Sequence, residues 1–270
     1  MKNNSKVGAV VLSVTAILFA VVGIALRCVN LFYFYETQTG YYYQGAVLPI
    51  VSTVLLIAAL VFFFLFSLLV FKKKEIDGAA HPVAKIFGAI PAVAAVAYLA
   101  ACDFTSEGKY AFVLGALSVM TALYFICSVV DVAPFIKLLC AVLAIIRLLT
   151  MLSKSYFNMH IGMNSPDKLL FEGACALAVV FIACEIKTAI GAPRPWFHLF
   201  VSAATTLICS AASVPSIIAS NTDILHKDIN IYAEYYVLFG IAVCSAVSLF
   251  CMLFDKKNAK EEPTDEYIIT

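Results

Sequence analysis

Eight apolar runs, each about as long as a membrane is thick, divide nearly the whole chain. A membrane-spanning helix needs about 20 apolar residues, and every run reaches or approaches that length. The runs cover residues 7–27, 46–71, 83–101, 110–130, 134–153, 167–190, 196–220 and 231–254. Strand-like alternation is absent from them, and lipid leaves the helix as the spanning form for such segments. The sequence therefore predicts an all-α polytopic membrane protein with eight transmembrane helices.

The composition agrees with a fold that faces lipid. Of the 270 residues, 63% are hydrophobic and only 13% are charged, whereas soluble domains are about half apolar and about a quarter charged. The net charge of +1 gives no sign of a nucleic-acid partner. We expect the lipid bilayer to be the main partner and the cytoplasmic membrane to be the location.

Lys and Arg set the expected orientation, because cytoplasmic loops carry an excess of positive charge. With the N-terminus inside, twelve of the 18 Lys and Arg residues fall on the inner side, five fall on the outer side, and Arg147 lies within a span. Both termini are therefore predicted to be cytoplasmic. The polar segment 256–270 is expected to form a disordered cytoplasmic tail.

Three short motifs recur along the chain and indicate an internal duplication. The segment 78–82 (GAAHP) resembles 191–195 (GAPRP), Tyr33-Phe34 with Gly40 resembles Tyr156-Phe157 with Gly162, and Cys127 with Asp131 resembles Cys251 with Asp255. Each pair falls at the same place within a group of four spans. We expect a 4+4 repeat of two parallel four-helix halves, 1–131 and 132–255, an arrangement that some transporters use.

Four ionisable residues lie within the fifth and sixth apolar runs. Arg147 and Lys137 belong to the fifth run, and Glu172 and Glu185 belong to the sixth. An unpaired charge near the bilayer midplane costs at least about 2.5–3.5 kcal/mol. In an antiparallel hairpin of these two helices, Arg147 reaches the depth of Glu172, and Lys137 reaches that of Glu185. These are the two candidate intramembrane charge pairs.

Each expected pair has a structural and a functional interpretation. Arg147 lies too deep to reach the interface, so its pairing with Glu172 either fixes the helix register, binds an anionic group or relays a proton. Lys137 and Glu185 lie nearer the inner interface, where long side chains extend to water, and this favours a structural role for them. The sequence predicts no catalytic, cofactor-binding or metal site. The four histidines show no metal-ligand spacing: His81, His160, His198 and His226.

The segment 28–45 between the first two runs is rich in aromatic residues. It contains Phe32, Tyr33, Phe34, Tyr35, Tyr41, Tyr42 and Tyr43. Tyr and Trp gather at membrane–water interfaces, so the segment is typical of an interfacial aromatic belt. An aromatic platform for a ligand is the alternative interpretation.

Several loop motifs are similar to those of one group of bacterial proteins. The segments are 156–159 (YFNM), 163–168 (MNSPDK), 191–195 (GAPRP) and 39–41 (TGY). Together they resemble polytopic membrane proteins of Gram-positive anaerobic bacteria. The resemblance implies a multi-pass bacterial membrane protein, and it brings neither a function nor assigned residues.

The sequence favours a role within the membrane over catalysis. The duplication, the charges within spans and the short loops favour transport or binding of a small solute, alone or in a larger complex. The alternative is a non-transporting sensor, assembly or immunity-type protein that acts through a membrane-protein partner. An intramembrane enzyme ranks last, because the sequence shows no clustered nucleophile, metal or acid–base set, and no cofactor is expected.

Overall fold

The computed structural model describes residues 2–36, 41–71, 82–130, 132–158, 165–191, 194–222 and 229–254. Their helices are α1 (Lys2–Tyr33), α2 (Val47–Phe71), α3 (Pro82–Thr105), α4 (Ala111–Val129), α5 (Pro134–Tyr156), α6 (Pro166–Ala189), α7 (Pro195–Asn221) and α8 (Ile229–Phe254). All eight are long and apolar enough to cross a membrane, which confirms the predicted all-α polytopic fold. A short antiparallel hairpin joins α1 to α2, formed by β1 (Tyr35–Glu36) and β2 (Tyr41–Tyr42).

The helix boundaries follow local sequence signals. Helices α5, α6 and α7 each begin with a proline (Pro134, Pro166 and Pro195), whose missing N–H is harmless in the first turn. Ser165 precedes α6, although its side chain makes no capping hydrogen bond. Beyond α6, Gly191 has a φ of 81°, a left-handed conformation that glycine adopts without strain and that commonly ends helices.

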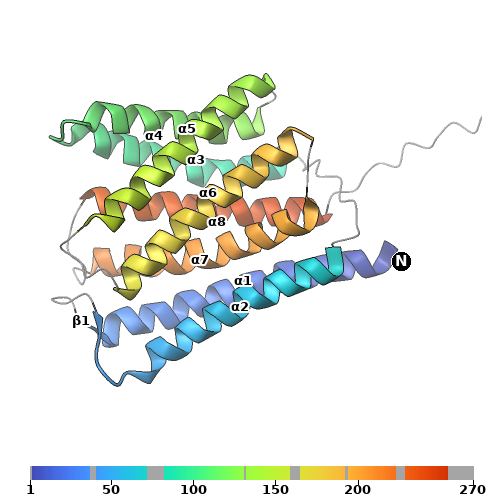
Figure 1. Ribbon diagram of the computed structural model, residues 1–270, viewed down its shortest axis with the longest axis horizontal. Helices are drawn as coiled ribbons and strands as arrows, with labels where there is room; N and C mark the ends of the chain where they lie inside the picture. The colour runs from blue at the N-terminus through green and yellow to red at the C-terminus, as the bar shows by residue number, and fades with distance from the viewer. Residues whose placement is uncertain are drawn as a thin grey trace, which may run out of the picture.

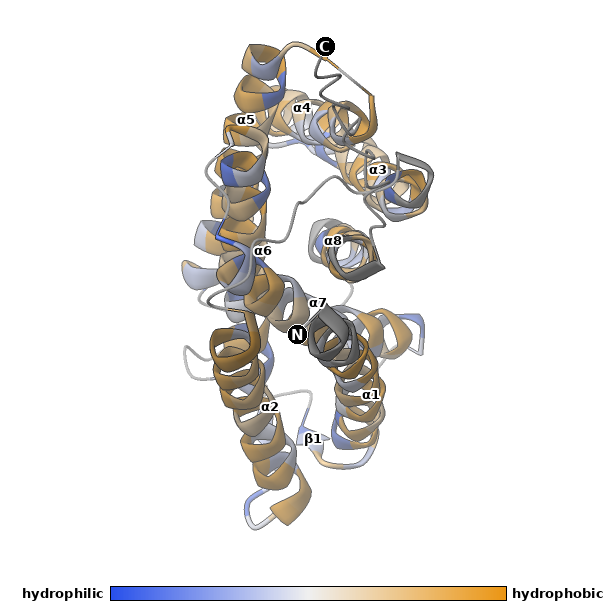
Figure 2. Ribbon diagram, turned by 90° about the vertical axis from the view of Figure 1, so that its right-hand side faces the viewer, coloured by the Kyte–Doolittle hydropathy of each residue, from blue (hydrophilic) through white to orange (hydrophobic). Residues whose placement is uncertain are grey.

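Helix α7 lies at the centre of the bundle. It packs against α1, α2, α6 and α8, and 83% of its membrane-length window is buried. Small side chains make up much of its buried surface, and such residues let neighbouring helices approach closely. Helix α8 lies between α7 and α3, whereas α3, α4, α5 and α6 each pack against the next in sequence (Figures 1 and 2).

Successive helices alternate in direction, so the bundle has two distinct ends (Figure 1). We call the end with β1 and β2 the hairpin end, and the opposite end, where α1 begins and α8 finishes, the N-terminal end. Hydrophobic residues predominate along the helices (Figure 2), and many large ones are exposed on the bundle surface, as contact with lipid tails requires. That the N-terminal end faces the cytoplasm stays a prediction.

The packing of the helices crosses the predicted boundary between two halves at residue 131. Helices α1 and α2 pack against α7, and α3 packs against α8, so the two groups of four interleave. The recurring segment at 78–81 and the predicted tail at 256–270 lie outside the described residues. The 4+4 duplication therefore stays a prediction.

Candidate functional site

A buried ion pair joins α3 to α5 in the half of the bundle nearer the hairpin end. Nη2 of Arg147 lies 2.9 Å from Oδ2 of Asp103. Nε of Arg147 donates to the Ser118 hydroxyl of α4 at 2.8 Å, and that hydroxyl donates to the same Asp103 oxygen at 2.7 Å. Arg147 also donates to Thr150 at 3.1 Å. Only 3% of Arg147 and 4% of Asp103 is exposed, so the cluster is closed and its charges are balanced.

This arrangement corrects the predicted pairing of Arg147 with Glu172. The hydroxyl of Ser155 donates to Oε1 of Glu172 at 3.3 Å. Ser155 is eight residues beyond Arg147, or about 12 Å along α5. The two antiparallel helices are therefore shifted from the assumed register, and Arg147 contacts a carboxylate on α3 instead of one on α6.

The second predicted pair is also arranged differently. Oε1 of Glu185 lies 3.0 Å from Nε2 of His198 on α7, and it accepts a hydrogen bond from Ser248 of α8 at 2.7 Å. Nδ1 of His198 lies 3.2 Å from the Thr188 hydroxyl on α6. Glu185 thus contacts His198 and Ser248 instead of Lys137, which makes an interaction of its own. The side chain of Glu185 contacts α7 and α8, and a quarter of it is exposed.

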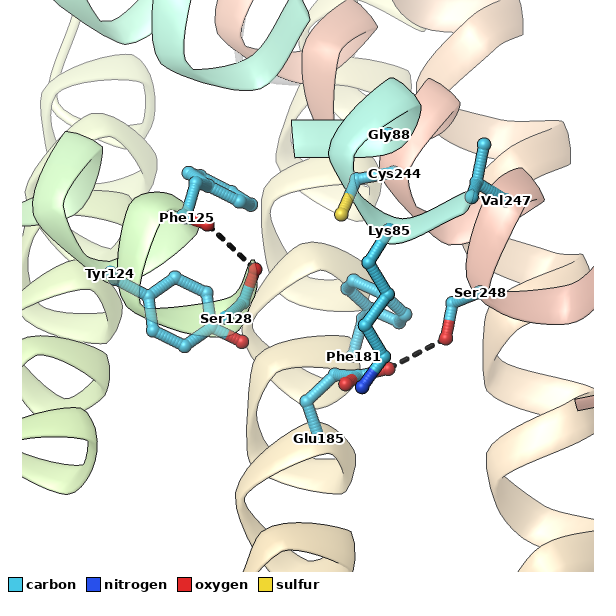
Figure 3. Close-up of a pocket in the computed structure, with 10 residues that line it drawn as sticks. All are labelled: Lys85, Gly88, Tyr124, Phe125, Ser128, Phe181, Glu185, Cys244, Val247 and Ser248. Carbon is cyan, nitrogen blue, oxygen red and sulfur yellow. Dashed lines mark hydrogen bonds between the residues drawn. The ribbon is translucent and has the colours of Figure 1, made fainter. Parts of the chain in front are cut away.

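A cavity of about 30 Å³ lies beside this carboxylate, between α3, α4, α6 and α8 (Figure 3). This volume holds about two water molecules. Lys85, Tyr124, Ser128, Glu185 and Ser248 provide its polar lining. In Figure 3 the Lys85 ammonium and the Tyr124 hydroxyl point toward the Glu185 carboxylate. The apolar walls are Phe125, Phe181 and Val247, which lower the local dielectric and strengthen polar interactions inside.

Tyr124 has a hydroxyl that a molecule in this cavity could contact. It is only 3% exposed, and it lines the cavity from α4. Its hydroxyl forms no hydrogen bond with another residue that the structure describes. Buried hydroxyls in native proteins normally have a partner, which is often an ordered water. A molecule in the cavity would supply that partner.

Two basic residues occupy equivalent positions around Glu185. Lys85 is the third residue after Pro82 at the start of α3, and His198 is the third residue after Pro195 at the start of α7. His198 touches the carboxylate, and the charge of Lys85 acts on it from across the cavity. Sequence reasoning treated the histidines as scattered and missed this site. The shared spacing of proline and basic residue was the signal that could have revealed it.

A third polar cluster holds the hairpin against the bundle. Arg27 of α1 contacts both Tyr42 of β2 and Asp167 in the first turn of α6. Burial raises the pKa values of the Tyr35 and Tyr42 phenols, and the nearby Arg27 charge partly opposes that rise. The cluster therefore connects α1, the hairpin and α6 through buried polar contacts.

No protein-family model, curated protein or solved structure matches this chain. The fold therefore defines the class, a multi-pass helical membrane protein, and the assignment of the cavity as the candidate site rests on its geometry. The resemblance to proteins of Gram-positive anaerobic bacteria stays a prediction.

Proposed function

We propose that the chain binds and transports a small solute within a bacterial cytoplasmic membrane, and that the cavity beside Glu185 is the binding place. The observation that carries the proposal is the convergence of Lys85, Tyr124 and Glu185 on one cavity from three different helices. Ionisable residues inside membrane bundles usually line solute or ion pathways. Clefts between the helices of a bundle are also common ligand sites.

The lining suits a small polar solute. The Lys85 ammonium and the Tyr124 hydroxyl can donate hydrogen bonds, and Oε2 of Glu185 can accept one because the contacts of His198 and Ser248 go to Oε1. The available 30 Å³ limits the occupant of this conformation to something close to water in size. A larger solute requires α3 and α8 to separate, since these helices form one wall of the cavity.

A thermal-shift screen of small solutes on the purified protein tests the binding site. A solute that binds only the folded state raises the unfolding temperature. That rise should disappear in Lys85→Met and Tyr124→Phe. It should persist in Ser155→Ala, whose hydroxyl contacts Glu172 near the hairpin end and does not line the cavity. Persistence of the rise in both cavity variants would place the binding site elsewhere.

Uptake into proteoliposomes then separates transport from binding. A transporter should accumulate the identified solute inside the vesicles, and the two cavity variants should lose that uptake. Binding without uptake would favour the second candidate, a sensor, assembly or immunity-type protein acting through a partner. The closed Arg147 cluster favours this second candidate, because its balanced charges leave little to attract a solute.

A further inference from the structure

We propose that the ion exchanged at this cavity is a proton, held between Glu185 and His198. The inference deepens the proposed function by naming the ion, and it rests on the same cavity. It requires no knowledge of the solute. The pair itself is the first observation, because Nε2 of His198 and Oε1 of Glu185 are 3.0 Å apart and can share a proton.

The charges around the cavity favour a proton over other ions. A metal cation in the cavity would meet the Lys85 ammonium, and an inorganic anion would meet the Glu185 carboxylate. Like charges at such short range in a poorly solvated site repel strongly. A proton also adds one positive charge, but it binds covalently as part of an imidazolium, and the Glu185 carboxylate 3.0 Å away offsets the repulsion from Lys85.

The groups facing the pair come from every helix around it. Lys85 faces it from α3, Tyr124 from α4, and Cys244 with Ser248 from α8. Thr188 of α6 contacts the other nitrogen of His198. Helix α5 also packs against α6 and carries Lys137, which has an interaction of its own. Among the residues that line the cavity, Lys85 supplies the positive charge that balances Glu185. This lining is therefore neutral, and with His198 protonated the group carries one positive charge.

The cavity gives the proton a route out of the pair. His198 has only 7% of its side chain exposed, whereas Glu185 has 25% exposed and lines the cavity. The proton bound as imidazolium moves from Nε2 to the carboxylate, which becomes a carboxylic acid. As the acid gives its proton to a cavity water, that water passes one of its own protons to water outside, so that no hydronium stays beside Lys85. The Tyr124 hydroxyl, which has no partner among the described residues, can accept and donate a hydrogen bond to that water.

Nuclear magnetic resonance of the full-length protein with isotope-labelled histidine, in lipid nanodiscs, tests the inference directly. The chain has four histidines, and His198→Gln identifies the signal of His198 by its loss. At one fixed pH, Glu185→Gln should shift that signal, because it removes the negative charge that lies 3.0 Å from the ring nitrogen. Ser155→Ala should leave the signal unchanged. Tyr124→Phe should slow exchange of the ring proton with water.

Two results would overturn the proton site. One is a His198 signal that is the same in wild type and Glu185→Gln, and the other is a ring proton whose exchange with water is unchanged in Tyr124→Phe. If Glu185→Gln does not fold, Ser248→Ala removes one hydrogen bond to the same oxygen and should shift the His198 signal by a smaller amount. The resonance experiment contains no solute, so a failed solute screen does not affect its result. Failure of the resonance experiment would likewise leave the proposed solute site in place.

Discussion

The guanidinium of Arg147 and the carboxylate of Asp103 are joined both directly and through the Ser118 hydroxyl, which accepts from one and donates to the other. Removing one partner of a buried pair costs about 3–5 kcal/mol because a lone charge remains. Arg147→Met and Asp103→Asn should each lower thermal stability in detergent by this amount. The double variant Arg147→Met with Asp103→Leu should recover much of the loss. Strictly additive losses in the double-mutant cycle would contradict the pair.

Glu172→Gln is the matched control for this cycle. Its contact is a hydrogen bond of 3.3 Å from Ser155. Hydrogen bonds to charged groups contribute about 1.5–3 kcal/mol to stability, and glutamine retains part of this because its amide oxygen still accepts. The loss should therefore be well below that of Asp103→Asn. A loss as large as that of Asp103→Asn would mean that Arg147 depends on Glu172 after all.

Alanine substitution at two glycines should change stability in opposite directions, because only one of them lies at the close crossing of α3 and α8. A Cβ at Gly240 would lie 2.6 Å from the Cα of Ala92, whereas a Cβ at Gly173 would meet nothing within 4 Å. Gly240→Ala should therefore lower stability by about 1–3 kcal/mol through overpacking. Gly173→Ala should be neutral or raise stability by about 0.5–1 kcal/mol, because alanine favours helix. Thermal unfolding measures both, and equal effects would contradict the crossing.

The contacts of the hairpin predict a loss of stability at high pH. Burial raises the pKa of the Tyr42 phenol above its ordinary value of 10. Unfolded Tyr42 loses its proton near pH 10 while the folded protein retains it, so its contribution to stability is constant below that pH and falls above it. Unfolding measured against pH should show a smaller alkaline decline in Tyr42→Phe. An unchanged decline would assign it to other groups.

Orientation gives a separate prediction, because the Lys and Arg bias places the N-terminal end inside. Asn158 and Asn221 follow or close helices at the hairpin end. Cysteines substituted there should react with an impermeant reagent on intact cells, and Gly78→Cys should react only after permeabilisation. Peptide mass spectrometry separates these sites from the nine native cysteines. Labelling of Gly78→Cys in intact cells would reverse the topology.

The eight helices could be predicted from sequence because each is a nearly uninterrupted apolar run of membrane-spanning length. Asp103 was missed because the third run was ended at residue 101, whereas α3 continues to Thr105. Its helical spacing held the signal, since Asp103 follows the buried Val96 and Leu99 by seven and four residues on the same face. Periodicity would have shown that Asp103 faces the core.

The partners of the four charged residues within the spans could not be predicted from their depth in the membrane alone. Depth along a hairpin limits which residues meet on adjacent helices, but Arg147 contacts a residue beyond α4 and Glu185 contacts α7 and α8. These contacts depend on how the helices arrange around α7, which apolar runs of similar composition do not specify. The contact between Glu185 and His198 could have been predicted from the sequence. The helices α6 and α7 are adjacent and antiparallel, and both residues lie near the turn that joins them.

The reactivity of a native thiol tests the central claim that the cavity beside Glu185 admits polar molecules. Cys244 lines this cavity, whereas Cys209 of α7 is fully buried and does not. The protein in proteoliposomes is treated with a small polar thiol reagent, which can reach the cavity when α3 and α8 separate. The labelling rate of each cysteine is measured by peptide mass spectrometry. Cys244 should react faster than Cys209, and an identified solute should slow it. Equal inertness of the two thiols would contradict an accessible site at Glu185.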